Sequence, residues 1–397
     1  MQYRPFHLYF AAAAGAFSRG VFTVTTAWTA LTLTNDIASV GRVLMIWSVL
    51  ALFIGPFVGV FVDRHDRRLC VLTGQGVCTI ALALPLLPVA LSYSLIVAVS
   101  LIWAIGQLLI VGPFDALLQG SVAPGLRRQI GARMGSARQI AMVAGGGLAG
   151  FIVHYFGAIG GYFIAASSAA LMWAAVFALR SVTIEKRGVT VSGYVAHLKE
   201  GLDYLANYPA LLGTAAIGAL AFSAGQMTNA LLPAFIRNDI GAGSDLYGVA
   251  DAAWSAGAVA GSALVIYLLK TRKLALLDGQ SLLALGILMG SLFFIKLPTP
   301  VIAIQVLAGG AANIAKAISD GNILHRCAED KIGRVRSLVQ ALTGLMGIVI
   351  YLSPSVLRNY SAGQIYLVWG IVLAIVGAVL SLAIIRSKQS HAQPEER

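Results

Sequence analysis

The sequence predicts an all-α membrane protein in which twelve transmembrane helices form two pseudo-symmetric six-helix bundles. Three observations predict this fold class. The 397 residues are 58% hydrophobic and only 11% charged, the mean hydropathy is +0.82, and apolar runs of about 20 residues, enough to cross a bilayer, recur along the chain. Soluble domains carry about 25% charged residues, so this composition excludes a water-soluble enzyme, and its high hydrophobicity excludes a disordered chain.

The predicted spans are apolar runs separated by charge clusters and by Gly or Pro. They are expected to be helices because lipid offers backbone amides no hydrogen-bonding partner, and because the alternating segments of a transmembrane barrel are missing. The twelve spans are 7–34, 39–62, 69–90, 94–117, 133–156, 159–180, 209–236, 245–269, 275–296, 301–325, 335–357 and 362–386.

Basic residues predict the orientation of these spans. Lys and Arg number 28 against 16 Asp and Glu, which gives a formal net charge of +12. If the N-terminus is cytoplasmic, most of the 28 fall on the cytoplasmic side, as the positive-inside rule requires. We therefore expect a multi-pass protein of the bacterial cytoplasmic (inner) membrane with both termini in the cytoplasm, and we attribute the charge excess to its loops and not to nucleic-acid binding.

The longest connection, 181–208, divides the chain into its predicted domains. Tyr194, Leu198, Leu202 and Leu205 are predicted to share one face of an amphipathic surface helix, with charged residues on the other face. The predicted organisation is an N-terminal bundle (1–180), a cytoplasmic linker (181–208), a C-terminal bundle (209–386) and a cytoplasmic tail (387–397).

The two halves repeat each other in sequence. Segment 67–75 matches 272–280, and 133–139 matches 334–340, at a near-constant offset that also carries Asp115 onto Asp320. Parallel repeats are a transporter architecture in which the substrate site lies between the halves, near the bilayer midplane.

The segment Gly59-Val-Phe-Val-Asp-Arg-His-Asp-Arg-Arg68 resembles the cytoplasmic loop signature of the major facilitator superfamily, Gly-x-x-x-Asp-Arg-x-Gly-Arg-Arg. Asp66 replaces the second glycine, as in drug:proton antiporter-3-like exporters of the macrolide-efflux and enterobactin-exporter type. The surface helix and the run 241–248 are also similar to that group, so the resemblance covers essentially the whole chain. The glycine-rich run 145–150 lacks the proline of the antiporter signature, and such glycines let helices approach closely.

The resemblance implies a charge network that closes the cytoplasmic side. Arg64, Arg67 or Arg68 is expected to pair with Asp115, and the repeat predicts that Arg272 or Lys273 pairs with Asp320. The simpler alternative is a basic loop that only sets the topology. The predicted gate residues are Asp63, Arg64, Arg67, Asp115, Arg138, Arg272 and Asp320.

Arg19, Arg138 and Lys316 lie inside predicted spans, and two of them, Arg19 and Lys316, lie at a depth where charge is costly and usually functional. Arg19 and Lys316 stand on spans one and ten, which the resemblance implies line the cavity with spans four and seven, and these four spans carry no acid at comparable depth. Such a cavity favours an anion, because Arg offers a planar fork to a carboxylate or catecholate. The alternatives are that Lys316 pairs with Asp320 on the helix face and that Arg19 caps carbonyls or snorkels. The predicted substrate-binding residues are Arg19, Gln107, Gln226, Asn229, Asn313 and Lys316.

Asp251, about two turns into span eight, can carry a coupling proton or can face an outer vestibule. The three cysteines show no metal spacing, and no phosphate loop or nucleophile–base arrangement is found. We therefore expect no metal, no cofactor and no enzymatic activity.

The sequence predicts a monomeric secondary active exporter of a small anionic metabolite, such as a carboxylate or catecholate siderophore, that works by alternating access in exchange for protons. Its expected partners are the small-molecule substrate and the lipid bilayer. The alternatives are a multidrug or macrolide efflux antiporter, uptake of an organic anion, and a membrane sensor that transports nothing.

Overall fold

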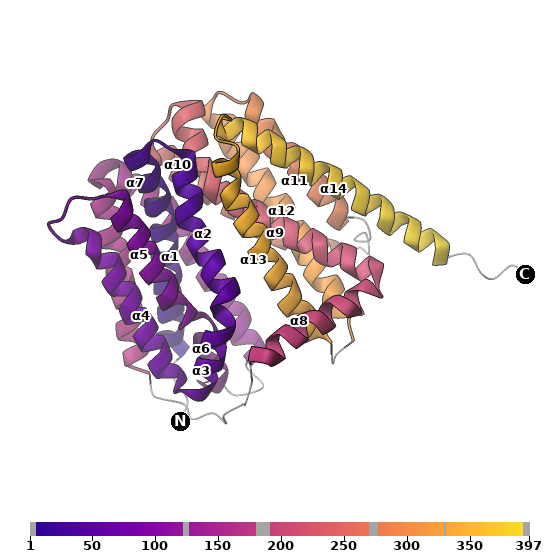
Figure 1. The fold of residues 1–397 in the computed structure, drawn as a ribbon, viewed down its shortest axis with the longest axis horizontal. Helices are drawn as coiled ribbons and strands as arrows, with labels where there is room; N and C mark the ends of the chain where they lie inside the picture. The colour runs from indigo at the N-terminus through magenta and orange to yellow at the C-terminus, as the bar shows by residue number, and fades with distance from the viewer. Residues whose placement is uncertain (1–4, 122–126, 180–190, 270–276, 329–330, 392–397) are drawn as a thin grey trace, which may run out of the picture. The chain divides into compact units, whose positions relative to one another are not determined.

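The computed structural model describes residues 5–121, 127–179, 191–269, 277–328 and 331–391 (Figure 1). Every regular element in these ranges is helical, which confirms the predicted fold class. The chain divides into two compact units. Unit 1 comprises Met1–Gly193 with Gly243–Ala252, and unit 2 comprises Tyr194–Ala242 with Ala253–Arg397.

Unit 1 is built around its first helix. Helix α1 packs along α7 and also contacts α2 and α5, while α4 packs on α5 and α7. The helices of this unit are α1 (Pro5–Thr34), α2 (Ile37–Phe53), α3 (Gly55–Arg64), α4 (Arg67–Ala83) with the short η1 (Leu84–Leu86), α5 (Tyr93–Leu108), α6 (Val111–Ser121) and α7 (Arg127–Phe177).

Unit 2 is likewise built around its first long helix, α9, which packs on α12, α13 and α14. Its helices are α8 (Val191–Ala206), α9 (Pro209–Ala234) with the π-helix η3 (Phe235–Ile240), α10 (Ser244–Leu269), α11 (Leu277–Ser291) with η4 (Leu292–Phe294), α12 (Pro298–Arg326), α13 (Ile332–Val356) and α14 (Ala362–His391). The first turns of α10 belong to unit 1 and its remainder to unit 2.

Each of the twelve predicted spans has a helical counterpart in the described ranges. Eight helices are long and apolar enough to cross a membrane, and nine if α2 and α3 are counted as one span bent by 56°. Helix α7 holds two predicted spans that meet at Gly157. The other two spans are supplied by α1 and by α11 with η4.

Glycine and proline explain where the helices break. Gly157 has φ 68° and ψ −175°, a backbone conformation that is essentially restricted to glycine. Pro56 lies at the start of α3, and Pro113 lies just inside α6. Each lacks the amide proton that would continue the preceding helix. The span predicted over 39–62 is bent where α3 begins, whereas Tyr93–Leu117 remains a single span with a short interruption between α5 and α6.

The loop between α3 and α4 is held by two side chains of the charged segment 59–68. Asp66 accepts a hydrogen bond from the Leu69 amide at 3.1 Å and so caps α4. Arg68 donates to the carbonyls of Val176 at 3.4 Å and Phe177 at 2.6 Å, which is a favourable place for a cation because the carbonyls at a helix C-terminus carry partial negative charge. The acid that replaces the expected glycine is therefore a helix cap.

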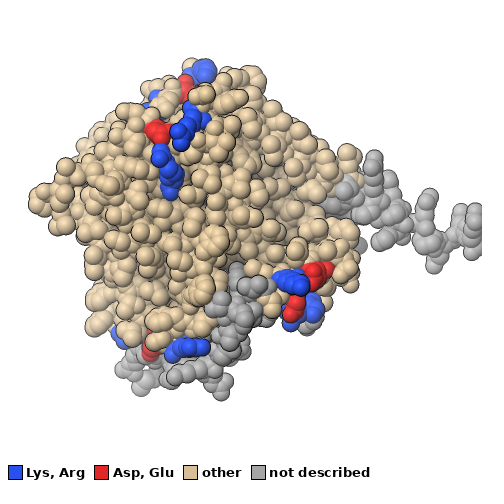
Figure 2. Space-filling view, in the orientation of Figure 1, with Lys and Arg blue, Asp and Glu red and all other residues tan. Residues whose placement is uncertain are grey.

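The surface has the polarity of a membrane-embedded protein. Figure 2 shows Lys, Arg, Asp and Glu gathered at two ends of the visible face, with an uncharged zone between them. Large apolar side chains are exposed in both units, among them Phe57, Phe163, Ile266, Ile287 and Ile375. Such surface is stable only against lipid, so the chain is a multi-pass membrane protein.

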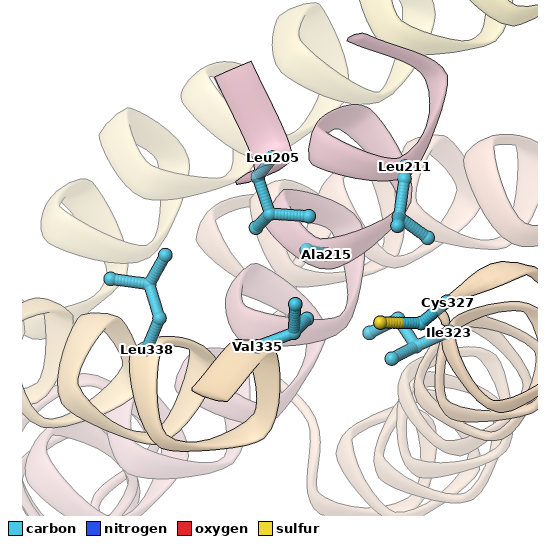
Figure 3. Packing of buried hydrophobic residues seen from close by; sticks show 7 residues of the cluster. All are labelled: Leu205, Leu211, Ala215, Ile323, Cys327, Val335 and Leu338. Carbon is cyan, nitrogen blue, oxygen red and sulfur yellow. The ribbon is translucent and has the colours of Figure 1, made fainter. Parts of the chain in front are cut away.

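Helix α8 is docked on unit 2 where α9, α12 and α13 meet (Figure 3). Leu205 is fully buried in an apolar cluster with Leu211, Ala215, Ile323, Cys327, Val335 and Leu338. Glu200 pairs with Arg334 at 2.5 Å. Leu202 was expected on the buried face but is 52% exposed. The side of α8 that packs on unit 2 is the side that carries Glu200 and Leu205, and Leu202 lies outside it. The side chain of Tyr194 lies outside the described residues.

Candidate functional site

A cavity of about 330 Å³ lies inside unit 1 and is lined by α1, α5, α6 and α7. This is within the size range of small-molecule pockets. Its polar lining consists of Arg19, Gln107, Asp115, Arg138 and Gln139, and its bulky apolar lining consists of Ile110, Val111, Phe114, Met142 and Met172. Four predicted residues, Arg19, Gln107, Asp115 and Arg138, therefore share one cavity.

Arg19 occupies the middle of α1 and is half-buried. Its Nη2 donates to Oε1 of Gln107 at 2.5 Å, and Nε2 of Gln107 in turn donates to Sγ of Cys78 at 3.5 Å. Among the described residues, no carboxylate lies within ion-pair distance of this guanidinium. The hydrogen-bond partner of Arg19 is thus a neutral amide, and none of the described carboxylates compensates its charge.

Two glycines set the position of α1 against α7. A Cβ on Gly20 would lie 2.3 Å from the Met142 carbonyl oxygen, and a Cβ on Gly145 would lie 2.3 Å from the Phe17 carbonyl oxygen. The two backbones therefore touch on either side of Arg19, as small residues allow in membrane bundles. This contact holds α1 so that Arg19 faces the cavity beside α7.

Asp115 is paired with Arg138, and within the described part of the chain it does not pair with Arg64, Arg67 or Arg68, which corrects the expected pairing. Nη2 of Arg138 lies 2.7 Å from Oδ1 of Asp115. Arg68 instead binds the carbonyls at the end of α7. The ion pair joins α6 to α7 at one side of the cavity.

Part of the predicted gate cannot be placed. Arg272 and Lys273 and the side chain of Asp63 lie outside the described residues. In unit 2, Asp320 pairs with Lys316 at 2.6 Å, one helical turn away on α12. The pairing stated as the alternative for Lys316 is therefore present. The two repeat-related acids both have a basic partner, but one pair joins two helices and the other lies within one helix.

The remaining predicted substrate-binding residues lie in unit 2, where three of them tie its helices together. Asn313 donates to the Ala258 carbonyl at 2.8 Å and to Ser262 Oγ, which links α12 to α10. Asn229 is hydrogen-bonded to Tyr351 of α13. The amide of Gln226 packs against Gly347, where a Cβ would lie 2.5 Å from Oε1. Together with Lys316 they form no part of the described lining of the Arg19 cavity.

Asp251 stands on the first turns of α10, against the glycine-rich stretch of α7. A Cβ on Gly146 would lie 2.4 Å from Oδ2 of Asp251, and a Cβ on Gly150 would lie 2.4 Å from the Ser244 carbonyl oxygen. The carboxylate is half-buried, and in the ranges that the structure covers it has neither an ion-pair nor a hydrogen-bond partner. The glycines thus make room for an acid as well as for helix contact.

Sequence reasoning missed the apolar and small lining of the cavity. Ala12, Gly15, Ala16 and Arg19 recur at helical spacing on α1, and Arg138 and Met142 are one turn apart on α7. Residues spaced by three or four share a helix face. Once Arg19 and Arg138 were placed in the site, helical spacing in the sequence could therefore have predicted that these neighbours line the same cavity.

No family model and no curated protein matches the chain, but solved structures do. It is similar to a mutant form of the nucleoside transporter NupG (TM-score 0.73, 15% identity, covering 96% of this chain and 99% of that one). It is also similar to a bacterial homologue of the iron transporter ferroportin in an inward-facing state (0.74, 13%, 95% and 98%) and to a peptide transporter in complex with sulfate (0.75, 13%, 96% and 94%). These likenesses show the fold alone: the chain shares the all-α fold of these transporters.

Proposed function

We propose that the protein is a secondary active transporter that carries a small organic anion across the bacterial cytoplasmic membrane by alternating access. The observation that carries the proposal is the charge of Arg19, which lines a cavity inside a membrane bundle with only the neutral amide of Gln107 as its partner. A cation in that position is costly without a counter-charge. A bound anion supplies the counter-charge. Binding therefore removes the free-energy cost of the unpaired Arg19, and this gain increases the affinity for the substrate.

The substrate class that fits best is a carboxylate or a catecholate. Gln107 takes one nitrogen of the guanidinium, so the rest of its planar fork is left for two parallel hydrogen bonds to an anion. Phe114, Met142 and Met172 give the cavity an apolar wall that suits an aromatic ring. A volume of about 330 Å³ admits a single small metabolite or one catecholate unit.

Asp251 is the residue that we propose for proton coupling. Its carboxylate lacks a partner in the described part of the chain, and Gly146 leaves space beside it. A lone acid in a membrane bundle is costly when it is charged, so it is suited to taking up and releasing a proton. We propose export because the loop at 59–68 resembles that of exporters.

The loop residues Asp63, Arg64 and Arg67 and the Asp115–Arg138 pair are proposed to form the gate on the cytoplasmic side. Arg272 and Asp320 are proposed to form the corresponding gate of the second bundle, where Asp320 also pairs with Lys316. Because Lys316 is already neutralised by Asp320, the anion proposal depends on Arg19.

The test is transport by the purified full chain in proteoliposomes, with 2,3-dihydroxybenzoate as the probe and a pH gradient as the driving force. We expect Arg19→Gln to lower transport at least tenfold, as expected for the loss of a charge-assisted hydrogen bond. Asp251→Asn is expected to remove the response to the pH gradient while probe binding persists. Arg358→Gln, an exposed position at the end of α13, is the matched control. Wild-type transport by Arg19→Gln would contradict the proposal.

A further inference from the structure

We infer that Arg138 is a second anion anchor in the same cavity, and that the substrate carries two negative groups, one bound by Arg19 and the other by Arg138. The inference builds on the proposed function and assigns a substrate class to its site. Asp115 then occupies Arg138 only in the absence of substrate. A negative group of the substrate displaces the Asp115 carboxylate and binds Arg138 in its place.

The geometry of Arg138 leaves room for a ligand. Arg138 and Arg19 line one compact cavity. Arg138 contacts Asp115 through a single nitrogen and a single oxygen, at 2.7 Å, although a guanidinium can bind a carboxylate through two parallel hydrogen bonds. Its plane is held over the Phe114 ring, with 5.1 Å from Cζ to the ring centroid. The guanidinium is therefore fixed in place while most of its donors are uncommitted to Asp115.

Charge balance favours a doubly charged ligand when Asp115 leaves. The described charged lining consists of two guanidinium groups and one carboxylate. Asp115 is the more exposed partner of the pair, at 52% against 35% for Arg138, so its carboxylate can turn to water at low cost. An exposed single-contact ion pair contributes little to stability, whereas a bidentate carboxylate binds more strongly. A dianion that spans both arginines also removes the repulsion between them.

This exchange would connect binding to the gate. Asp115 lies on α6, which is separated from α5 by the break before Pro113, and its pair with Arg138 holds α6 to α7. When the ligand takes Arg138, α6 loses that contact. The arrival of a dianion, and not of a monoanion, thus releases the helix end that carries Asp115. The fitting ligands are dicarboxylates and carboxylates with a second acidic group.

The experiment is equilibrium binding to the purified full chain at constant ionic strength. The probes are succinate, glutarate and adipate, each compared with the monocarboxylate of the same chain length. We expect the wild type to bind at least one dicarboxylate tenfold or more tightly than its monocarboxylate, and Arg138→Gln to lose that preference while keeping monocarboxylate affinity. Asp115→Asn is expected to raise dicarboxylate affinity severalfold, because the competing carboxylate is gone.

Two further variants make the result decisive. Arg138→Lys keeps the charge and the stem but replaces the fork by a point charge, so it should retain only part of the preference, and it serves if Arg138→Gln does not fold. Arg358→Gln should bind like the wild type. If Arg138→Gln keeps the dicarboxylate preference, or if the wild type has none, the second anchor is refuted while Arg19-dependent binding leaves the proposed function standing. If Arg19→Gln alters the binding of none of these anions, the proposed function fails as well.

Discussion

At the scale of single residues, Gly146 and Gly150, one turn apart on α7, have different structural roles. The space beside Gly150 is closed by backbone, since a Cβ there would lie 2.4 Å from the Ser244 carbonyl oxygen and 2.6 Å from Cα of Gly248. The space beside Gly146 is closed only by the end of the Asp251 side chain, which can rotate away. The same substitution therefore tests helix contact at one position and the placement of an acid at the other.

Gly150→Ala is expected to lower the free energy of unfolding by about 1–3 kcal/mol, the usual cost of overpacking against a backbone that cannot yield. Gly146→Ala is expected to leave stability nearly unchanged and to weaken the response of transport to the pH gradient, because it displaces Asp251. Thermal unfolding in detergent measures the first effect, and proteoliposome transport measures the second. Equal stability losses in the two variants would show that the side chain of Asp251 cannot move.

At the scale of elements, α8 shows which features of a helix an amphipathic pattern predicts and which it does not. The helix was predicted, and Leu198 and Leu205 pack on unit 2 as expected, but Leu202 does not. Gly201 lies so close to α13 that a Cβ there would be 2.8 Å from the Arg334 carbonyl oxygen. That contact rotates Glu200 toward unit 2 and Leu202 away from it. A pattern of apolar residues identifies a helix, but close backbone contact with another element decides its rotation.

Leu205→Ala should therefore destabilise the protein by about 2–5 kcal/mol, the cost of removing a fully buried leucine from a cluster. Leu202→Ala on the same helix should change stability by less than about 0.5 kcal/mol, as is usual for surface positions. Thermal unfolding of the two variants side by side provides the measurement. A larger loss for Leu202→Ala would mean that α8 docks through its other face.

At the scale of the whole molecule, the spans could be predicted because hydropathy and helix length report them directly, while the repeat inferred from matching residues stays a prediction. The Lys316–Asp320 pair was among the stated alternatives, because residues four apart share a helix face. The partners of Arg68 and Arg138 could not be predicted, because several acids and carbonyls were possible and only the packing of α6 and α7 decided between them. The cavity was likewise expected between the halves, whereas the pocket described here lies inside unit 1. Arg19 and Gln107 were found because polar groups are rare in apolar spans.

The central claim is that Arg19 binds the anion that the protein carries, and calorimetric titration of the purified protein with 2,3-dihydroxybenzoate tests it most directly. We predict saturable binding to the wild type and to Arg358→Gln, and an affinity at least tenfold weaker for Arg19→Gln, because the mutant cavity loses its uncompensated charge. Equal affinity of the wild type and Arg19→Gln would contradict the account.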